Sequence, residues 1–245
     1  SLTVNPEKQA AIEIERLLKF PGFLKRDSFA KGRVEIVELR VDERSRLCNV
    51  ALSELNRVIK CRVLVCAVLR RGDVVAPDGS FVLREGDRIF VTASTESLAT
   101  LLDNLGIITK KVNHVMICGG GRVSYYLAQQ LEKDGMTVRL IEKDPKHCEE
   151  LAALLPKTEI INDDASNTFV LKRENIESCD ALVTATGMDE LNMIISLYGT
   201  KHGVSQVITK LGHMENGSMI DQLPIGSTIW PKDLCCNGIV RYIRA

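Results

Sequence analysis

A glycine-rich turn in the middle of the chain constrains its fold more than any other feature. The apolar run over residues 112–118 stops abruptly at Gly119, Gly120 and Gly121, after which a helix is expected. Gly119 allows a tight turn from strand to helix, and Gly121 lets the backbone come close to a pyrophosphate. Because the free N–H groups and the dipole of a helix N-terminus attract anions, the turn predicts a phosphate-binding site.

An acidic residue completes this pattern. Glu142 ends the next apolar run at the spacing of roughly 20 residues where a carboxylate can accept both ribose hydroxyls of a dinucleotide. Ser124 stands where a third glycine is common, but that glycine serves helix packing rather than phosphate contact. Three glycines can also form an ordinary turn, and Glu142 can belong to a solvated helix start. Strand, glycines, helix and acid together favour a dinucleotide-binding domain.

The chain divides into three parts. Residues 1–23 are expected to form one helix that ends at Pro21-Gly22. Residues 30–108 predict a small α+β domain, because short β-rich runs alternate with turn signals. Residues 112–245 alternate apolar strands with helices. That alternation is typical of a Rossmann-type α/β domain with a doubly wound parallel sheet covered on both faces.

The expected elements of the two larger parts are as follows. In the first, strands are expected at residues 34–41, 62–69, 74–77 and 88–92, with helices at 52–55 and 95–105. In the second, strands are expected at residues 112–118, 137–142, 158–162, 180–185, 205–210 and 227–230. The helices between them are expected to begin near Arg122, Pro145, Thr168, Asp189 and Met214.

The two ends of the chain resemble each other. Asn5 is expected to cap the first helix, and Pro6 to occupy its first position. From Pro6 onwards, several residues recur at an offset of 225 (231 − 6). The matches are Pro6, Ala10-Ala11, Arg16 and Leu17-Leu18 with Pro231, Cys235-Cys236, Arg241 and Tyr242-Ile243. Chance similarity of two amphipathic helices is the alternative. A genuine repeat makes residues 1–23 the terminal helix of a preceding nucleotide-binding domain, in a tandem protein.

Composition excludes several classes of function. The 245 residues leave room for two domains with cores of their own. Lys+Arg and Asp+Glu each number 32, so no net field attracts nucleic acid or an anionic membrane. The sequence has no apolar stretch long enough to span a bilayer and no signal peptide, so direct membrane insertion is not expected. The chain opens at Ser1 instead of methionine, which leaves truncation or processing of its N-terminus open.

The eight cysteines are expected to be reduced. Cys118 and Cys179 lie in or beside apolar runs, where cysteine behaves as a small hydrophobic residue. No Cys-x-x-Cys pair occurs, Cys235 and Cys236 are adjacent, and the four histidines are scattered. These spacings favour a cytoplasmic protein without a metal site.

Both halves of the chain resemble the RCK (KTN) proteins, which regulate potassium uptake systems and gated potassium channels. In the second half, the stretches that match a nucleotide-binding RCK domain are residues 115–123, 138–145, 161–165, 179–186 and 189–192. In the first half, Ser53-Glu54-Leu55, Pro77-Asp78-Gly79 and residues 83–89 resemble the companion C-terminal RCK domain. The order of helix, companion domain and nucleotide-binding domain resembles the middle of a duplicated, TrkA-type subunit of a Trk system.

The resemblance implies a cytoplasmic, non-catalytic regulatory subunit at the inner face of the cell membrane. It also implies binding of NAD(H), or of ATP or ADP, with a membrane-embedded potassium transporter as the partner. Two departures from the family pattern lie at the expected mouth of the site: Asp163 in place of glycine, and Gly187-Met188 in place of a polar pair. They can change affinity or ligand choice, or abolish binding in this copy.

The candidate ligand-binding residues follow the carboxyl ends of the expected strands. Arg122 is expected to bind phosphate, with a solvated side chain as the alternative. Asp164, which the resemblance places with Ala165 beside adenine, can instead cap the next helix. Residues 184–186 are expected to form the floor near the second phosphate or the nicotinamide, while Lys210 either reaches the ligand or lies on the surface. The set is Gly119, Gly120, Gly121, Arg122, Val123, Glu142, Lys143, Asp164, Ala165, Thr184, Ala185, Thr186 and Lys210, with no catalytic or metal-binding residue among them.

Two other functions stay open. An NAD-dependent oxidoreductase needs a proton donor or acceptor within reach of its substrate. No Tyr-x-x-x-Lys motif occurs. His202 and His213 are the only histidines in the right region, and both are expected to lie on the surface. Alternatively, residues 33–108 can sense another small molecule, with the acidic loops Asp42-Glu43 and Glu85-Gly86-Asp87 as cation sites or as solvated turns.

The nucleotide-binding domain is expected to self-associate. Residues 231–245 predict an amphipathic helix whose apolar stripe includes Ile239, Val240 and Ile243. Another subunit is a natural cover for such a stripe, so a homo-oligomer is predicted. The helix near Leu17-Leu18 is expected to make the equivalent contact with its own partner domain.

Overall fold

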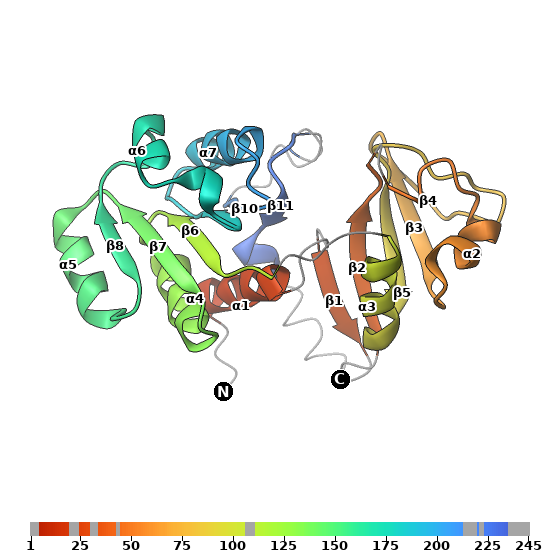
Figure 1. The fold of residues 1–245 in the computed structure, drawn as a ribbon, viewed down its shortest axis with the longest axis horizontal. Helices are drawn as coiled ribbons and strands as arrows, with labels where there is room; N and C mark the ends of the chain where they lie inside the picture. The colour runs from red at the N-terminus through yellow and green to blue at the C-terminus, as the bar shows by residue number, and fades with distance from the viewer. Residues whose placement is uncertain are drawn as a thin grey trace. The chain divides into compact units, whose positions relative to one another are not determined.

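The protein forms two compact units, one comprising Ser1–Lys19 with Lys111–Ala245 and the other Phe20–Lys110. The computed structural model describes residues 5–19, 25–29, 34–42, 45–105, 111–212, 220 and 223–234. Several residues singled out in the sequence lie outside these ranges, namely Pro21, Gly22, Glu43, His213, Met214, Cys235, Cys236, Ile239, Val240, Arg241, Tyr242 and Ile243. Figure 1 shows the helices and strands of both units.

The larger unit is built on a parallel sheet of six strands in the order β11-β10-β9-β6-β7-β8. The strands are β6 (His114–Cys118), β7 (Thr137–Glu142), β8 (Glu159–Asn162), β9 (Ala181–Thr184), β10 (Gln206–Lys210) and β11 (Ser227–Ile229). Each lies at a run predicted from the sequence. Strands β6, β9, β10 and β11 are almost entirely buried, which explains their apolar runs, because a parallel sheet is covered on both faces. The edge strand β8 is partly exposed. The predicted Rossmann-type α/β fold is therefore confirmed.

Helices cover both faces of this sheet (Figure 1). They are α4 (Arg122–Lys133), α5 (Pro145–Leu154), α6 (Thr168–Arg173) and α7 (Asp189–Lys201), and each begins at the predicted residue. Helices α4 and α5 share one apolar cluster with the sheet, and α6 and α7 share another. The connecting helices thus lie on one face of the sheet on the β6 side and on the other face on the β9 side. The carboxyl ends of these two neighbouring strands form the crevice where open α/β sheets bind ligands.

Helix α1 (Pro6–Lys19) belongs to the same unit although residues 20–110 intervene in the sequence. The predicted N-cap is confirmed, because Asn5 Oδ1 accepts the Lys8 N–H at 2.9 Å. Ile14, Leu17 and Leu18 are fully buried in the cluster that includes α4, and each contributes about 1.5–3 kcal/mol by burial. Helices α1 and α4 lie side by side in Figure 1, so α1 is an integral part of this core.

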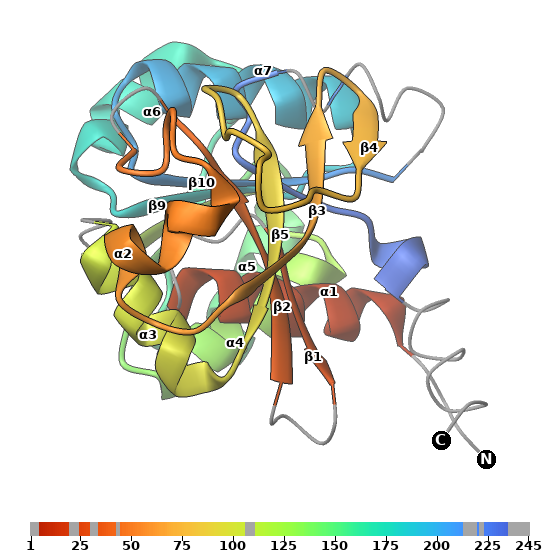
Figure 2. The ribbon, with the colours of Figure 1, turned by 90° about the vertical axis from the view of Figure 1, so that its right-hand side faces the viewer.

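The smaller unit has an antiparallel sheet in the order β1-β2-β5-β3-β4. The strands are β1 (Lys25–Phe29), β2 (Val34–Arg40), β3 (Leu64–Arg70), β4 (Asp73–Val75) and β5 (Arg88–Ala93). A 3₁₀ turn η2 (Leu52–Glu54) continues into α2 (Leu55–Ile59), and α3 is Thr95–Asn104. Helices α2 and α3 bury leucine and isoleucine side chains against the sheet and lie together beside it in Figure 2, which gives the predicted α+β domain.

Strand β1 was not predicted. Its sequence, Lys-Arg-Asp-Ser-Phe, is mostly polar and lacks the β-branched residues that mark a strand. It lies at the edge of the sheet and pairs with β2 alone, from Lys25 opposite Glu38 to Phe29 opposite Val34. Backbone pairing with β2 therefore extends the sheet N-terminally of residue 30, where the predicted domain began.

Candidate functional site

A cleft of about 750 Å³ lies at the carboxyl ends of the strands in the larger unit. It brings together most residues predicted to bind a ligand: Gly119, Gly120, Gly121, Glu142, Lys143, Asp164, Ala165, Ala185, Thr186 and Lys210. Arg122, Val123 and Thr184 are not among its lining residues. The other lining residues are Ile141, His147, Asp163, Ser166, Gly187, Met188, Glu190, Leu191 and Ile194.

The three glycines of the turn meet different constraints. Gly119 has a φ of +98°, and a Cβ placed on it would lie 2.8 Å from Thr186 Cα. A Cβ on Gly120 would lie 2.7 Å from Leu151 Cδ1. Gly121 is the N-cap of α4, and a Cβ there would meet nothing within 4 Å. Backbone conformation and packing therefore require glycine at position 119, and packing requires it at position 120. At Gly121 the protein itself leaves room for a side chain, so only a bound ligand in that open space would require glycine there.

Glu142 is anchored to this turn through both carboxylate oxygens. Its Oε2 accepts the Gly120 N–H at 2.7 Å, and its Oε1 accepts the Asp144 N–H at 2.9 Å. A carboxylate has about four acceptor positions, so each oxygen keeps one for a further donor. Glu142 is therefore held at the cleft in a geometry that can still accept two hydroxyl groups.

Asp163 and Asp164 directly follow β8. Asp164 Oδ1 accepts the Ser166 N–H at 2.8 Å, and this hydrogen bond holds the pKa of Asp164 below its usual value. The N-cap of α6 is Asn167, so the alternative role of Asp164 as the cap of that helix is wrong. Asp163, the departure from the family pattern, accepts a hydrogen bond from Arg173 Nη2 at 2.9 Å. Arg173 thus offsets the extra negative charge at the mouth of the cleft.

Lys210 reaches the cleft from the end of β10. Its Nζ donates a hydrogen bond to the Thr186 carbonyl oxygen at 2.9 Å, which excludes the alternative of a surface lysine. Burial lowers the pKa of Lys210, and Asp189 opposes that effect. Buried Asn192 accepts from the Thr186 N–H at 2.9 Å and donates to the Lys210 carbonyl oxygen at 2.9 Å. These bonds fix the ends of β9 and β10 relative to each other.

Three candidate side chains lie elsewhere. Thr184 is fully buried, and its hydroxyl bonds Ser196 Oγ on α7 at 2.9 Å, so it faces the core and not the cleft. Val123 packs into the core cluster, which leaves only its backbone N–H for a ligand. The Arg122 side chain is 80% exposed and lies 3.7 Å from Glu7 of α1, so it is largely solvated.

His147 lines the cleft and was missed in the sequence. Its Nε2 lies 2.8 Å from the Gly120 carbonyl oxygen and its Nδ1 lies 3.2 Å from Glu150 Oε2. These contacts, that with Gly120 first, raise the pKa of His147. His202, one of the two histidines considered in the sequence for a catalytic role, lies 2.8 Å from Glu177 and outside the cleft lining. His147 lies in the first turn of α5, the helix that follows Glu142. This position close to a predicted ligand-binding residue is the sequence feature that could have identified it.

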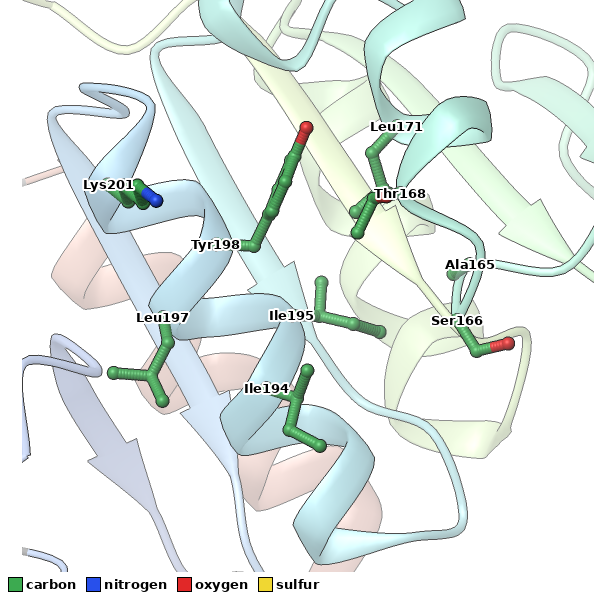
Figure 3. Close-up of a pocket in the computed structure, with 9 residues that line it drawn as sticks. All are labelled: Ala165, Ser166, Thr168, Leu171, Ile194, Ile195, Leu197, Tyr198 and Lys201. Atoms are coloured by element: carbon green, nitrogen blue, oxygen red, sulfur yellow. The ribbon is translucent and has the colours of Figure 1, made fainter.

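A smaller, apolar hollow of about 230 Å³ adjoins the cleft. Figure 3 shows Leu171 of α6 together with Ile195 and Tyr198 of α7 around it. It shares Ala165, Ser166 and Ile194 with the larger cleft. The side of the cleft where adenine was expected therefore has an apolar margin on α7.

The acidic loop of the smaller unit is an internally bonded turn. Arg70 Nε and Nη2 donate to the two oxygens of Asp87 at 2.7 Å each, and the Arg84 N–H donates to Asp87 at 2.8 Å. Burial alone would raise the pKa of Asp87, but these donors outweigh it and hold the value below the usual range. The Asp87 carboxylate is thus occupied by protein donors.

Among the residues that the structure describes, no group of three or more His, Cys, Asp or Glu side chains is arranged to hold a metal ion. Likewise, no described helix is long and apolar enough to cross a membrane.

Solved structures with the same fold include the GsuK channel bound to NAD and the GsuK RCK domain. The first has a TM-score of 0.63 at 16% identity, covering 98% of this chain and 43% of the channel chain. The second has a TM-score of 0.61 at 17% identity, covering 94% of this chain and 50% of that chain. At such low identity, the similarity concerns the fold alone.

Sequence comparison identifies the family. The TrkA-N domain matches residues 115–231 and the TrkA-C domain matches residues 36–106. The Trk system potassium uptake protein TrkA of Haemophilus influenzae is 31% identical over 98% of this chain and 53% of its own length. A TrkA homolog of Archaeoglobus fulgidus is 30% identical over 98% of this chain and 54% of its own length. The chain thus spans about half the length of these relatives. It belongs to the TrkA family and carries a TrkA-C domain followed by a TrkA-N domain.

Proposed function

We propose that this chain binds NAD(H), or else ATP or ADP, in the cleft and forms part of a regulatory subunit of a Trk-type potassium uptake system. One observation carries the proposal: the N-terminus of α4 opens onto free space at Gly121 while Glu142 is anchored beside it. Helix N-termini bind phosphate, and a carboxylate at this place binds ribose. The names of the TrkA relatives and the fold shared with the NAD-bound GsuK channel support it.

Each part of the cleft suits one part of a dinucleotide. The N–H groups of residues 121–123 are proposed to bind phosphate, with Gly119 and Gly120 shaping the turn and Arg122 swinging in from solvent. Glu142 is proposed to accept ribose hydroxyls. Lys143, Asp164 and Ala165 would border the adenine, and Ala185, Thr186 and Lys210 the second phosphate or the nicotinamide. Thr184 would act only by holding the strand end in place.

We also propose that this chain is part of a longer protein in which the nucleotide-binding domain occurs twice. Residues 1–23 would be the terminal helix of a preceding nucleotide-binding domain, residues 30–108 the C-terminal RCK domain, and residues 112–245 the next nucleotide-binding domain. The repeat between residues 6–18 and 231–243 supports this arrangement. So does the packing of α1 on α4, because it is the kind of contact that the terminal helix of one copy would make with another copy.

The proposed partner is a membrane-embedded potassium transporter subunit, with the chain on the cytoplasmic face of the membrane and without catalysis of its own. Mass spectrometry of ligand that co-purifies with the chain would test the nucleotide proposal. Binding titrations with NADH, NAD⁺, ATP and ADP, and an NADH-oxidation screen, would complete the test. We expect saturable binding without turnover. Robust turnover with a small carbonyl substrate would instead support an NAD-dependent oxidoreductase.

NADPH is expected to bind at least about tenfold more weakly than NADH, a difference of about 1.4 kcal/mol. The physical reason is that the 2′-phosphate of NADPH would meet the Glu142 carboxylate, and like charges in contact destabilise a complex. Competitive titration measures the ratio, and Glu142→Gln should narrow it because the amide is neutral. Equal affinities of the wild-type chain for NADH and NADPH would show that Glu142 does not contact the ribose.

The chain is expected to self-associate through the helical faces of the larger unit. Phe169 on α6, Ile194 on α7 and Met188 beside it are 68%, 61% and 57% exposed, and another subunit would cover apolar side chains of this kind. Light scattering should show a mass that rises with concentration, and Ile194→Glu should lower it. Val74→Glu in the smaller unit is the matched control, since Val74 is 71% exposed. A monomer at every concentration would contradict the prediction.

A further inference from the structure

Gly120, in the centre of the glycine turn, is held from both sides. Its N–H donates to Glu142 Oε2 at 2.7 Å, and its carbonyl oxygen lies 2.8 Å from His147 Nε2. The space for a Cβ is already filled by Leu151 of α5. The peptide groups that flank Gly120 therefore take their orientation from an acid at the end of β7 and a histidine at the start of α5.

Both ring nitrogens of His147 face acceptors. One faces the Gly120 carbonyl oxygen, and the other faces Glu150 Oε2 at 3.2 Å. A neutral imidazole has a single N–H and can donate to only one of them, whereas an imidazolium donates to both. The arrangement thus favours the protonated ring, which agrees with the raised pKa of His147.

The charged groups around His147 come from three elements. Glu150 lies on its own helix, and Glu142 and Lys143 lie at the end of β7. Asp163 and Asp164, at the end of β8, line the same cleft. The glycine turn itself contributes no side chain. Negative groups outnumber positive ones in this set, and Glu142 and Glu150 both favour the protonated ring.

We propose that His147 is a positioning residue of the nucleotide site, an inference that rests on the proposed nucleotide-binding function. The protonated ring holds the Gly120 carbonyl and so keeps the following N–H groups aimed at the ligand phosphate. Nucleotide affinity is therefore coupled to the protonation of His147.

The sign of this coupling follows from linkage. A bound pyrophosphate adds negative charge close to the ring, so binding raises the pKa of His147 further. Affinity is then highest below the pKa of the free chain and falls as the pH rises through the pKa of the complex. A difference of half a unit to one unit between the two states corresponds to about a threefold to tenfold change in Kd.

NAD⁺ titrations between about pH 6 and pH 8, the range in which histidine titrates, test the proposal. NAD⁺ is the suitable probe because its pyrophosphate diester does not itself ionise in this range. The wild-type Kd should weaken about threefold to tenfold towards the upper end. In His147→Gln, whose amide can still donate to the Gly120 carbonyl but does not titrate, the pH dependence should vanish. His202→Gln, which removes a histidine 2.8 Å from Glu177 and outside the cleft lining, should keep the wild-type profile.

A ligand-free readout separates this proposal from the function on which it rests. NMR titration of the ligand-free chain should give His147 a pKa above the ordinary value of about 6.5. Glu150→Gln should reduce that shift without removing it, because the contact with the Gly120 carbonyl oxygen remains. Equal pH profiles in the wild type and His147→Gln, or an unshifted His147, would overturn the positioning role. Absence of NAD⁺ binding at every pH would overturn the nucleotide function, whatever the ring titration shows.

Discussion

Replacing Gly121 with valine is expected to abolish nucleotide binding while leaving the ligand-free fold intact. Gly121 is the N-cap of α4, and a Cβ there meets nothing within 4 Å beyond its chain neighbours, so the free chain offers open space for a side chain. In the complex it would occupy the space of the pyrophosphate. Loss of two hydrogen bonds to charged phosphate, each about 1.5–3 kcal/mol, corresponds to a loss of affinity of about 100-fold or more.

Thermal melts with and without NAD⁺ separate the two effects of Gly121→Val. The ligand-free melting temperature should match that of the wild type, and the stabilisation by ligand should disappear. Gly79→Val in the smaller unit is the matched control, because a Cβ on Gly79 has only an ordinary contact at 3.7 Å. Undiminished stabilisation of Gly121→Val by NAD⁺ would place the phosphate elsewhere.

Gly119→Ala, unlike Gly121→Val, is expected to destabilise the ligand-free fold, by about 2–4 kcal/mol. One cause is the φ of +98°, which an alanine rarely adopts. The other is a collision, because the new Cβ would lie 2.8 Å from Thr186 Cα and 2.9 Å from the Ala185 carbonyl oxygen. Both neighbours are backbone atoms at the end of β9, so neither can rotate away.

Urea denaturation of the ligand-free chain measures this loss, and Gly135→Ala isolates its first cause. Gly135 has a φ of +76°, but a Cβ there would meet nothing within 4 Å. That control should therefore lose only the conformational part, about 1–2 kcal/mol. If Gly119→Ala costs no more than Gly135→Ala, the turn does not pack against β9 as tightly as the structure indicates.

The larger unit could be predicted from the sequence because its local signals agree with its topology. Buried parallel strands require apolar runs, and the helices between them begin at recognisable residues such as Pro145. The smaller unit was predicted less completely. Strand β1 is polar and pairs on one side only, so its existence depends on the backbone of β2, which no pattern within residues 25–29 reveals.

The sequence predicts those residues of the candidate site that belong to the glycine motif or lie at the carboxyl end of a strand. The glycine turn, Glu142 and Lys210 meet at one cleft because parallel strands present their carboxyl ends at the same edge of the sheet. Thr184 was misplaced because successive side chains of a strand point to opposite faces, and its hydroxyl meets α7. His147 was missed because its role depends on a contact with Gly120 across 27 residues of sequence.

The most direct test of the nucleotide site is an NMR titration of the backbone amides with NAD⁺. The largest shifts are predicted at the N–H groups of Gly121, Arg122 and Val123, with smaller ones at Glu142 and Lys210. They should saturate at one NAD⁺ per chain and disappear in Gly121→Val. Saturating NAD⁺ that leaves these amides unchanged, or that shifts only residues outside the cleft, would contradict nucleotide binding at the start of α4.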